Sequence, residues 1–229
     1  MCQVVSSGGA RTSVDLICVI DVSGSMSGQK IELVKETMRV LIETLTPSDR
    51  LSIITFESSG HRICPLKAVT QENLVSFSNH INELHAGGGT RIISGMDLAF
   101  KTIRDRKIAN KATSVFLLSD GQDGGAENMV KQALAHENNQ NLGIFSIHCF
   151  GFGTDHDESL MNKIACLKDG SFYFIKELST LDEAFCNALG GIISLVASEI
   201  IVNIRNISSG KVQGIKFGKF YGDKWHKLG

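Results

Sequence analysis

The 229-residue sequence has no long apolar run and no marked excess of charge of either sign. Its apolar runs, such as residues 115–118 and 200–202, are far too short to span a bilayer. Its 23 Lys and Arg residues nearly balance 24 Asp and Glu residues, which gives a formal net charge of −1. We therefore expect no membrane insertion and no partnership with nucleic acid, which requires a basic surface.

The sequence also lacks a signal-peptide pattern and paired cysteines. The first nine residues contain no basic stretch followed by an apolar core. The six cysteines, at positions 2, 18, 64, 149, 166 and 186, form no CxxC pair and no metal-ligand spacing. A chain long enough to bury a full core does not need a disulfide framework. We expect a reducing, cytoplasmic setting, with Cys18 and Cys149 in the core; the lone sequon at residues 206–208 is the one feature against it.

Short apolar runs alternate with stretches of helical periodicity along most of the chain. The pattern predicts strands at 14–20, 50–57, 62–69, 114–119, 142–150 and 171–175. It predicts helices at 31–45, 74–84, 92–103, 126–139, 160–167 and 181–196. Strands that alternate with helices are typical of an α/β fold with a mainly parallel sheet covered by helices on both faces. Pro65 suits an edge strand, so 62–69 is expected to be antiparallel there.

The last thirty residues follow a different pattern. Residues 200–207 and 212–220 flank Ser208-Ser209-Gly210, which indicates a β-hairpin with no helix after it. We accordingly divide the chain into an N-terminal extension (1–13), a main domain (14–198) and a C-terminal segment (199–229). This last segment is expected to be an extension or the start of a following domain, and the chain to be a piece of a longer protein.

Oxygen-bearing side chains follow the two most apolar strands. Asp21, Ser23 and Ser25 stand directly after the first strand, and Asp120 follows the run SVFLLS. In a doubly wound sheet, ligands bind at the carboxyl ends of central strands whose connections run in opposite directions. Two facing carboxylates repel each other unless a cation lies between them. A small site made only of oxygens suits Mg²⁺ better than Ca²⁺, with Ca²⁺ or Mn²⁺ as alternatives.

These residues resemble the metal-ion-dependent adhesion site of von Willebrand factor type A (VWA) domains. That family's pattern is DxSxS, then a distant Thr and a distant Asp; here it is matched by residues 21–25, by Thr90 in Gly88-Gly89-Thr90 and by Asp120 in Ser119-Asp120-Gly121. The similarity covers residues 14–196 and is greater to intracellular VWA proteins, namely copines and plant RING-type ubiquitin ligases, than to integrins. It implies a doubly wound six-stranded sheet of order 3-2-1-4-5-6 with one antiparallel edge strand.

The resemblance also implies a function and a role for each residue. Ser23 and Ser25 would bind the metal directly, Thr90 would do so when a partner is bound, and Asp21 and Asp120 would act largely through water. The partner would supply an Asp or Glu carboxylate to the remaining position. We therefore expect a cation-dependent protein-binding module without catalysis, whose oligomeric state the sequence leaves open.

Other interpretations of these motifs remain. A Mg²⁺-dependent phosphoryl-transfer enzyme or hydrolase also uses an aspartate after a central strand, but it usually needs a second carboxylate two residues later and a nearby lysine. Ser23 occupies that position, and the sequence places no lysine convincingly. The run GFGTDH after the fifth strand has His156 where a dinucleotide fingerprint has its third glycine. The nearby Asp155 and Asp157 are typical of a helix N-terminus.

The last predicted helix, 181–196, has an apolar face at helical spacing and two central glycines, Gly190 and Gly191. The resemblance implies that this helix slides when the metal moves toward Thr90, and glycine weakens a helix in a way that favours such movement. The alternative is a fixed helix whose glycines allow close packing.

Overall fold

The computed structural model describes residues 11–138, 142–177, 180–193, 219–221 and 224–226. The chain divides into two compact units, Met1–Val196 and Ala197–Gly229, and each is described by itself. Within the described part of the chain, no helix is long and apolar enough to cross a membrane.

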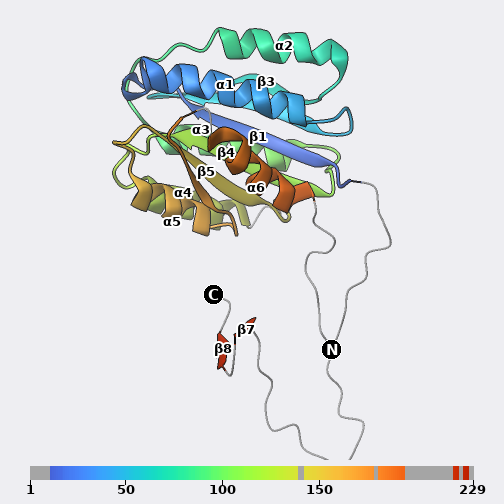
Figure 1. Ribbon diagram of the computed structural model, residues 1–229, viewed down its shortest axis with the longest axis vertical. Coiled ribbons are helices and arrows are strands. Elements are labelled where there is room, and N and C mark those ends of the chain that lie inside the picture. The colour runs from blue at the N-terminus through green and yellow to red at the C-terminus, as the bar shows by residue number, and fades with distance from the viewer. Residues whose placement is uncertain (1–10, 139–141, 178–179, 194–218, 222–223, 227–229) are drawn as a thin grey trace, which may run out of the picture. The chain divides into compact units, whose positions relative to one another are not determined.

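A six-stranded sheet forms the centre of the larger unit (Figure 1). Its order is β3-β2-β1-β4-β5-β6, and every neighbouring pair is parallel except β2 with β3. This confirms the predicted α/β fold, its strand order and its antiparallel edge strand. The strands are β1 (Val14–Asp21), β2 (Arg50–Phe56), β3 (Gly60–Ala68), β4 (Ala112–Ser119), β5 (Ser146–Phe152) and β6 (Phe172–Ile175).

Helices cover both faces of the sheet, because β1 and β4 are apolar on both sides and every residue in them is buried. One apolar cluster joins the sheet to α1, α2 and α6, and a second joins the other face to α3, α4 and α5. The helices are α1 (Gln29–Thr44), α2 (Gln71–Asn82), α3 (Ile92–Asp105), α4 (Ala126–Asn138), α5 (Glu158–Cys166) and α6 (Leu181–Ile193).

Two of the differences between the predicted and the observed element boundaries have a clear local cause. Strand β5 begins at Ser146 rather than at 142, because Gly143 adopts a φ of 73° and turns the chain. Leu142 and Phe145 are still buried, which explains why their apolar pattern suggested a strand. Helix α5 begins at Glu158, because the Asp157 side chain accepts a hydrogen bond from the backbone N–H of Leu160 and caps the helix.

Several core predictions are confirmed. Cys18 and Cys149 are fully buried and free, as expected of cysteines that act as small apolar residues. Pro65 lies in β3 at the edge of the sheet. In the smaller unit, β7 (Lys219–Tyr221) pairs antiparallel with β8 (Lys224–His226). The hairpin predicted at 200–207 and 212–220 lies almost wholly outside the described residues.

Candidate functional site

The site begins with two aspartates at the carboxyl ends of the two central strands. Asp21 is the last residue of β1, and Asp120 directly follows β4. Because these strands are parallel neighbours, their ends lie at the same edge of the sheet. Both aspartates are fully buried. The Asp21 carboxylate accepts hydrogen bonds from the Ser23 backbone N–H at 2.9 Å and from the Ser119 hydroxyl at 2.5 Å, which fixes its orientation.

The loop after β1 places two hydroxyl groups beside Asp21. Its short 3-10 helix η1 (Gly24–Met26) brings the Oγ atoms of Ser23 and Ser25 to within 3.1 Å of each other. Ser23 is fully buried and Ser25 is partly exposed, so the pair faces the rim of the sheet. The structure thus brings three of the predicted ligands together on one turn.

A second loop carries Thr90 to this turn. The Gly87 N–H donates to the Val22 carbonyl at 2.7 Å, and the Gly24 N–H donates to the Gly88 carbonyl at 3.0 Å. Gly88 has a φ of 81°, a left-handed backbone conformation that favours glycine. Thr90 follows two residues later and is half-buried. Within the described residues, its hydroxyl makes no hydrogen bond to the other four predicted ligands.

Asp123 joins the Thr90 loop to the loop after β4. Its carboxylate accepts a hydrogen bond from the Ile92 N–H at 2.7 Å, at the start of α3. Asp123 was not assigned to the site from the sequence. Its carboxylate binds a backbone N–H rather than adding an oxygen beside Asp120. All five predicted residues therefore lie on three loops that hydrogen bonds connect.

Among the described residues, the buried Asp21 carboxylate accepts hydrogen bonds but makes no ion pair. Burial raises the pKa of Asp21 above its ordinary value, hydrogen bonds from Ser119 and Ser23 partly oppose this, and the nearby charge of Asp120 adds to it. A carboxylate whose ionised form is disfavoured in this way is stabilised by a cation. The site thus favours a positively charged ligand.

Lys30 supplies one positive charge at this site. This residue was not identified as part of the site from the sequence. Its ammonium lies 2.9 Å from an Asp120 oxygen and 2.8 Å from an Asp155 oxygen. Burial lowers the pKa of Lys30, but the hydrogen bonds to Asp155 and Asp120 outweigh this effect and leave the pKa raised. The signal in the sequence was a lysine in the first turn of the helix that follows the DxSxS motif.

The loop after β5 closes the site on one side. The Asp157 N–H donates to the Asp120 carbonyl at 2.8 Å, and the Gln122 side chain donates to Asp155 at 3.3 Å. The helix-terminus explanation is therefore correct for Asp157, which caps α5, and incomplete for Asp155, which pairs with Lys30.

The donor set fits a hard divalent cation. Two buried carboxylates and two adjacent hydroxyls offer oxygen alone, which Mg²⁺, Ca²⁺ and Mn²⁺ prefer. The described residues contain no cluster of three or more His, Cys, Asp or Glu side chains suited to a metal. Such a cluster is not needed here, because two of the four side chains, Ser23 and Ser25, offer hydroxyl oxygens instead of carboxylates.

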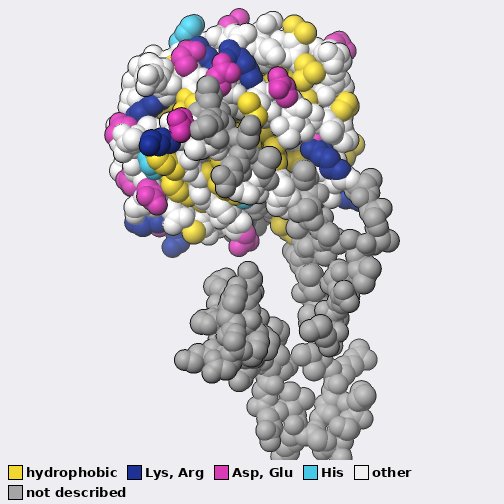
Figure 2. All heavy atoms as spheres, viewed as in Figure 1, with side chains coloured by type: hydrophobic (Ala, Val, Ile, Leu, Met, Phe, Trp, Pro, Cys, Tyr) yellow, Lys and Arg dark blue, Asp and Glu magenta, His cyan; other side chains and the backbone are white. Residues whose placement is uncertain are grey.

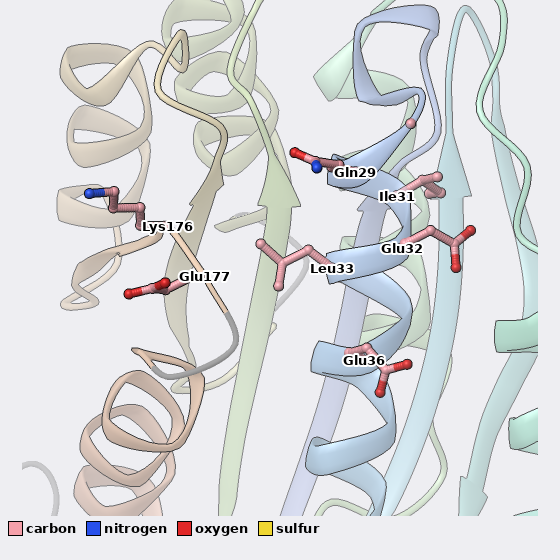
Figure 3. A pocket seen from close by; sticks show the side chains of 8 residues that line it. Gln29, Ile31, Glu32, Leu33, Glu36, Lys176 and Glu177 are labelled. Atoms are coloured by element: carbon pink, nitrogen blue, oxygen red, sulfur yellow. The ribbon is translucent and has the colours of Figure 1, made fainter.

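A groove on the same unit lies apart from these residues. It has a volume of about 860 Å³ and runs between α1 and the segment after β6. Figure 3 shows Leu33 extending from α1 into it, Glu32 and Glu36 pointing away, and Lys176 and Glu177 across from the helix. None of the five predicted ligands lines it. On the visible face, basic and acidic side chains are interspersed (Figure 2), in line with the balanced charge of the chain.

Comparison with known proteins identifies similar chains. The family model described as the von Willebrand factor type A domain matches residues 15–186. An E3 ubiquitin-protein ligase WAV3 of Arabidopsis thaliana is 30% identical over 196 residues, which cover 85% of this chain and 25% of that protein. The inter alpha-trypsin inhibitor heavy chain 4 of Mus musculus is 32% identical over 167 residues, covering 67% of this chain and 17% of its own length.

Solved structures agree on the fold. A von Willebrand factor type A protein from Catenulispora acidiphila superposes with a TM-score of 0.66 at 24% identity, over 78% of this chain and 42% of that one. The protein BatB from Bacteroides thetaiotaomicron gives a TM-score of 0.64 at 17% identity, over 78% of this chain and 98% of the other. The chain spans a quarter or less of the length of the two curated relatives described above.

Proposed function

The chain belongs to the von Willebrand factor type A domain family, and on this premise we propose that it is a divalent-cation-dependent protein-binding module. Its metal would be Mg²⁺, with Ca²⁺ or Mn²⁺ as alternatives. Domains of this family are mostly protein-interaction modules. A ubiquitin ligase and an inhibitor heavy chain, which differ in their named roles, both contain a region similar to this chain. Binding is a role that such different proteins can share.

The observation that carries the proposal is the pairing of two buried aspartates with two adjacent hydroxyls at one sheet edge. Ser23 and Ser25 would hold the cation through their hydroxyl oxygens, Asp21 and Asp120 would act largely through water, and Thr90 would join when a partner binds. When bound, the cation supplies positive charge that attracts an anionic group. Because the aspartates neutralise the cation only from a distance, an Asp or Glu of the partner would complete its coordination.

A phosphoryl-transfer enzyme or hydrolase is the alternative. The structure corrects one argument against it, since Lys30 does lie beside Asp120. The second carboxylate that this chemistry usually needs is still absent, because Ser23 stands two residues after Asp21. We therefore propose that the domain is not catalytic. Hydrolysis of a model phosphoester that requires Mg²⁺ and is lost in Asp21→Asn would overturn this part of the proposal.

We propose a reducing, cytoplasmic setting on the basis of the thiols. Among the described residues, Cys18, Cys64 and Cys149 are buried and free, which supports the proposed reducing, cytoplasmic environment.

A binding experiment with matched variants tests the module. The wild-type chain is immobilised, bound proteins are captured in Mg²⁺, and the column is eluted with a chelator. We expect specific partners to elute from wild type and to be lost with Ser25→Ala. Ser27→Ala is the control, because Ser27 is exposed two residues further along the same loop. Partners that stay bound to the wild-type chain in the chelator would contradict cation-dependent binding. So would partners that bind Ser25→Ala as well as they bind wild type.

A further inference from the structure

Lys30 is the feature of the site that the binding function above does not explain. Its ammonium is held between Asp120, a metal-site residue with no exposed surface, and Asp155, which is largely exposed. The side chain of Lys30 is itself only 15% exposed, and its carbon chain runs along Gly153. A Cβ at position 153 would lie 2.3 Å from Lys30 Cε, so Lys30 and the loop after β5 are in close contact.

Three loops meet at this one ammonium group. Lys30 comes from the start of α1, Asp120 from the end of β4 and Asp155 from the loop after β5. Gln122 adds a hydrogen bond to Asp155 at 3.3 Å. The contact is therefore a built arrangement with partners on both sides, unlike a surface lysine that points into solvent.

We propose that Lys30 is an internal counter-ion that sets the charge of the cation site, weakening its hold on the metal and keeping the bound metal attractive to a partner's carboxylate. This inference rests on the proposed function. Without metal, Lys30 compensates the buried Asp120. With a metal bound beside Asp120, the positive charge of Lys30 would repel the cation in a partly buried environment, where charges interact more strongly than in water. The metal also keeps more of its own charge for an incoming anion.

The alternative role for Lys30 is to position the Asp120 side chain. If Lys30 served only to hold Asp120 in the correct orientation, its removal would weaken metal binding. If it acts as a counter-ion, its removal would strengthen metal binding. The two roles therefore predict changes of opposite sign in the same measurement.

Isothermal titration with Mg²⁺ and with Mn²⁺ separates them. We expect Lys30→Met to lower the Kd for Mg²⁺ by about tenfold, because a repelling charge is removed. We expect Lys30→Arg, which keeps the charge, to stay close to wild type. Asp155→Asn should raise the Kd several-fold, because Lys30 then lacks its second neutralising partner. Lys101→Met, on the exposed side of α3, is the control and should change nothing.

A second readout uses the metal-free protein. Thermal unfolding in chelator should show a lower Tm for Lys30→Met than for wild type, because Asp120 then has no cation beside it. The Asp155→Asn variant, changed at an exposed position, keeps the proposal testable if Lys30→Met fails to fold.

The outcomes distinguish this inference from the proposed function. An unchanged or higher Kd in Lys30→Met, with metal bound by wild type, overturns the role of Lys30 alone. Metal binding that is absent in wild type and gained in Lys30→Met supports the counter-ion and overturns the wild-type function. Absence of binding in both proteins overturns both.

Discussion

At the scale of single residues, the site is governed by negative charge buried without enough compensation. Asp21 has two hydrogen-bond donors, Ser23 and Ser119, yet the pKa of its carboxyl is still raised, chiefly by burial. A carboxyl group whose pKa is raised in the folded state binds its proton more readily there, so its ionised form destabilises the metal-free protein at neutral pH. Under the proposed function, a bound cation would offset this cost at Asp21.

Replacing Asp21 with Asn should separate these two effects. The side chain keeps an acceptor for Ser23 and loses the buried charge, so the metal-free Tm at pH 7 should equal or exceed that of wild type. At a hundredfold excess of Mg²⁺ over its Kd, wild type should gain about 3 kcal/mol and Asp21→Asn nothing. Calorimetric melting with and without Mg²⁺ measures both values. A metal-dependent gain that persists in the variant would show that Asp21 is not part of the site.

His148 gives the fold a pH dependence. It is buried in β5 against Phe116 and Tyr173, and its Nδ1 accepts a hydrogen bond from the Ser171 N–H. Burial lowers its pKa from 6.5 to about 4. The unfolded chain therefore takes up a proton first as the pH falls, so stability is full above pH 6.5 and declines between 6.5 and 4.

We expect this one histidine to remove about 2 kcal/mol from the free energy of unfolding between pH 7 and pH 5. Urea unfolding at the two pH values measures the loss. His148→Gln, which retains an acceptor for Ser171, should lose less stability over the same interval. His136→Gln, at an exposed position in α4, should behave as wild type. An equal loss in wild type and His148→Gln would assign the pH dependence to other groups.

At the scale of elements, α6 packs where its sequence pattern predicts. Ala184, Phe185, Ala188, Leu189 and Ile192 are buried in the cluster that includes β1 and β4, and Phe185 stacks on Phe150 with ring centroids 4.9 Å apart. Two further apolar residues at the same helical spacing, at positions 181 and 196, have no described side-chain environment.

The two glycines of α6 have no close neighbour at their Cβ positions among the described residues outside the helix. Within the described structure, no atom lies within 4 Å of a Cβ placed on Gly190 or Gly191. The described neighbours thus do not require glycine at these positions, and both the sliding helix and the fixed helix stay predictions. Their remaining effect is to weaken the helix.

Gly191→Ala should therefore raise the free energy of unfolding by about 1 kcal/mol, because alanine favours the helix and meets open space. Denaturant unfolding measures this change. If sliding of α6 accompanies partner binding, the stiffened helix should also change partner affinity while leaving the Kd for Mg²⁺ in the absence of partner nearly unchanged. A destabilised Gly191→Ala protein would show that the helix needs glycine at this position.

Much of the architecture could be predicted because most segments show either a short continuous apolar run, typical of a buried strand, or apolar residues at helical spacing. The strand order was predicted from the family resemblance. Asp21 and Asp120 were predicted as site residues from their position after the two most buried strands. Lys30 and Asp155 could not be paired in advance, since they lie 125 residues apart and meet only through the packing of β5 beside β4. The early start predicted for β5 failed because the turn at Gly143 interrupts a run that remains apolar.

At the scale of the whole larger unit, the buried carboxylates at the two ends of the central strands differ in their ion pairs. At the amino end of β1, the fully buried Asp15 binds Arg50 through both of its oxygens at 2.7 and 2.6 Å, and also Arg106 at 2.9 Å. That carboxylate faces two guanidinium groups, whereas at the opposite end Asp21 accepts hydrogen bonds only from Ser23 and Ser119, and Asp120 shares one ammonium, that of Lys30, with Asp155. The amino end thus stabilises the sheet, and the carboxyl end is left with charge that can bind a ligand.

The variant Arg50→Met should lower the stability of the fold without changing metal binding at the opposite end of the strands. It breaks a two-pronged ion pair to a buried carboxylate, so the free energy of unfolding should fall by about 2 kcal/mol, with Arg106 limiting the loss. The Kd for Mg²⁺ should stay within about twofold of wild type, since distant sites act independently. Urea unfolding and titration calorimetry provide the two numbers. A large change in metal affinity would mean that the two ends are coupled.

The most direct test of the account is anomalous X-ray diffraction from crystals grown with Mn²⁺, collected at the manganese absorption edge. The account predicts one strong anomalous peak at the carboxyl ends of β1 and β4, in contact with the hydroxyl oxygens of Ser23 and Ser25. The same experiment on Asp21→Asn crystals should show no peak there. A peak elsewhere with these hydroxyls turned away, or none at saturating Mn²⁺, would contradict the assignment of this edge as a cation site.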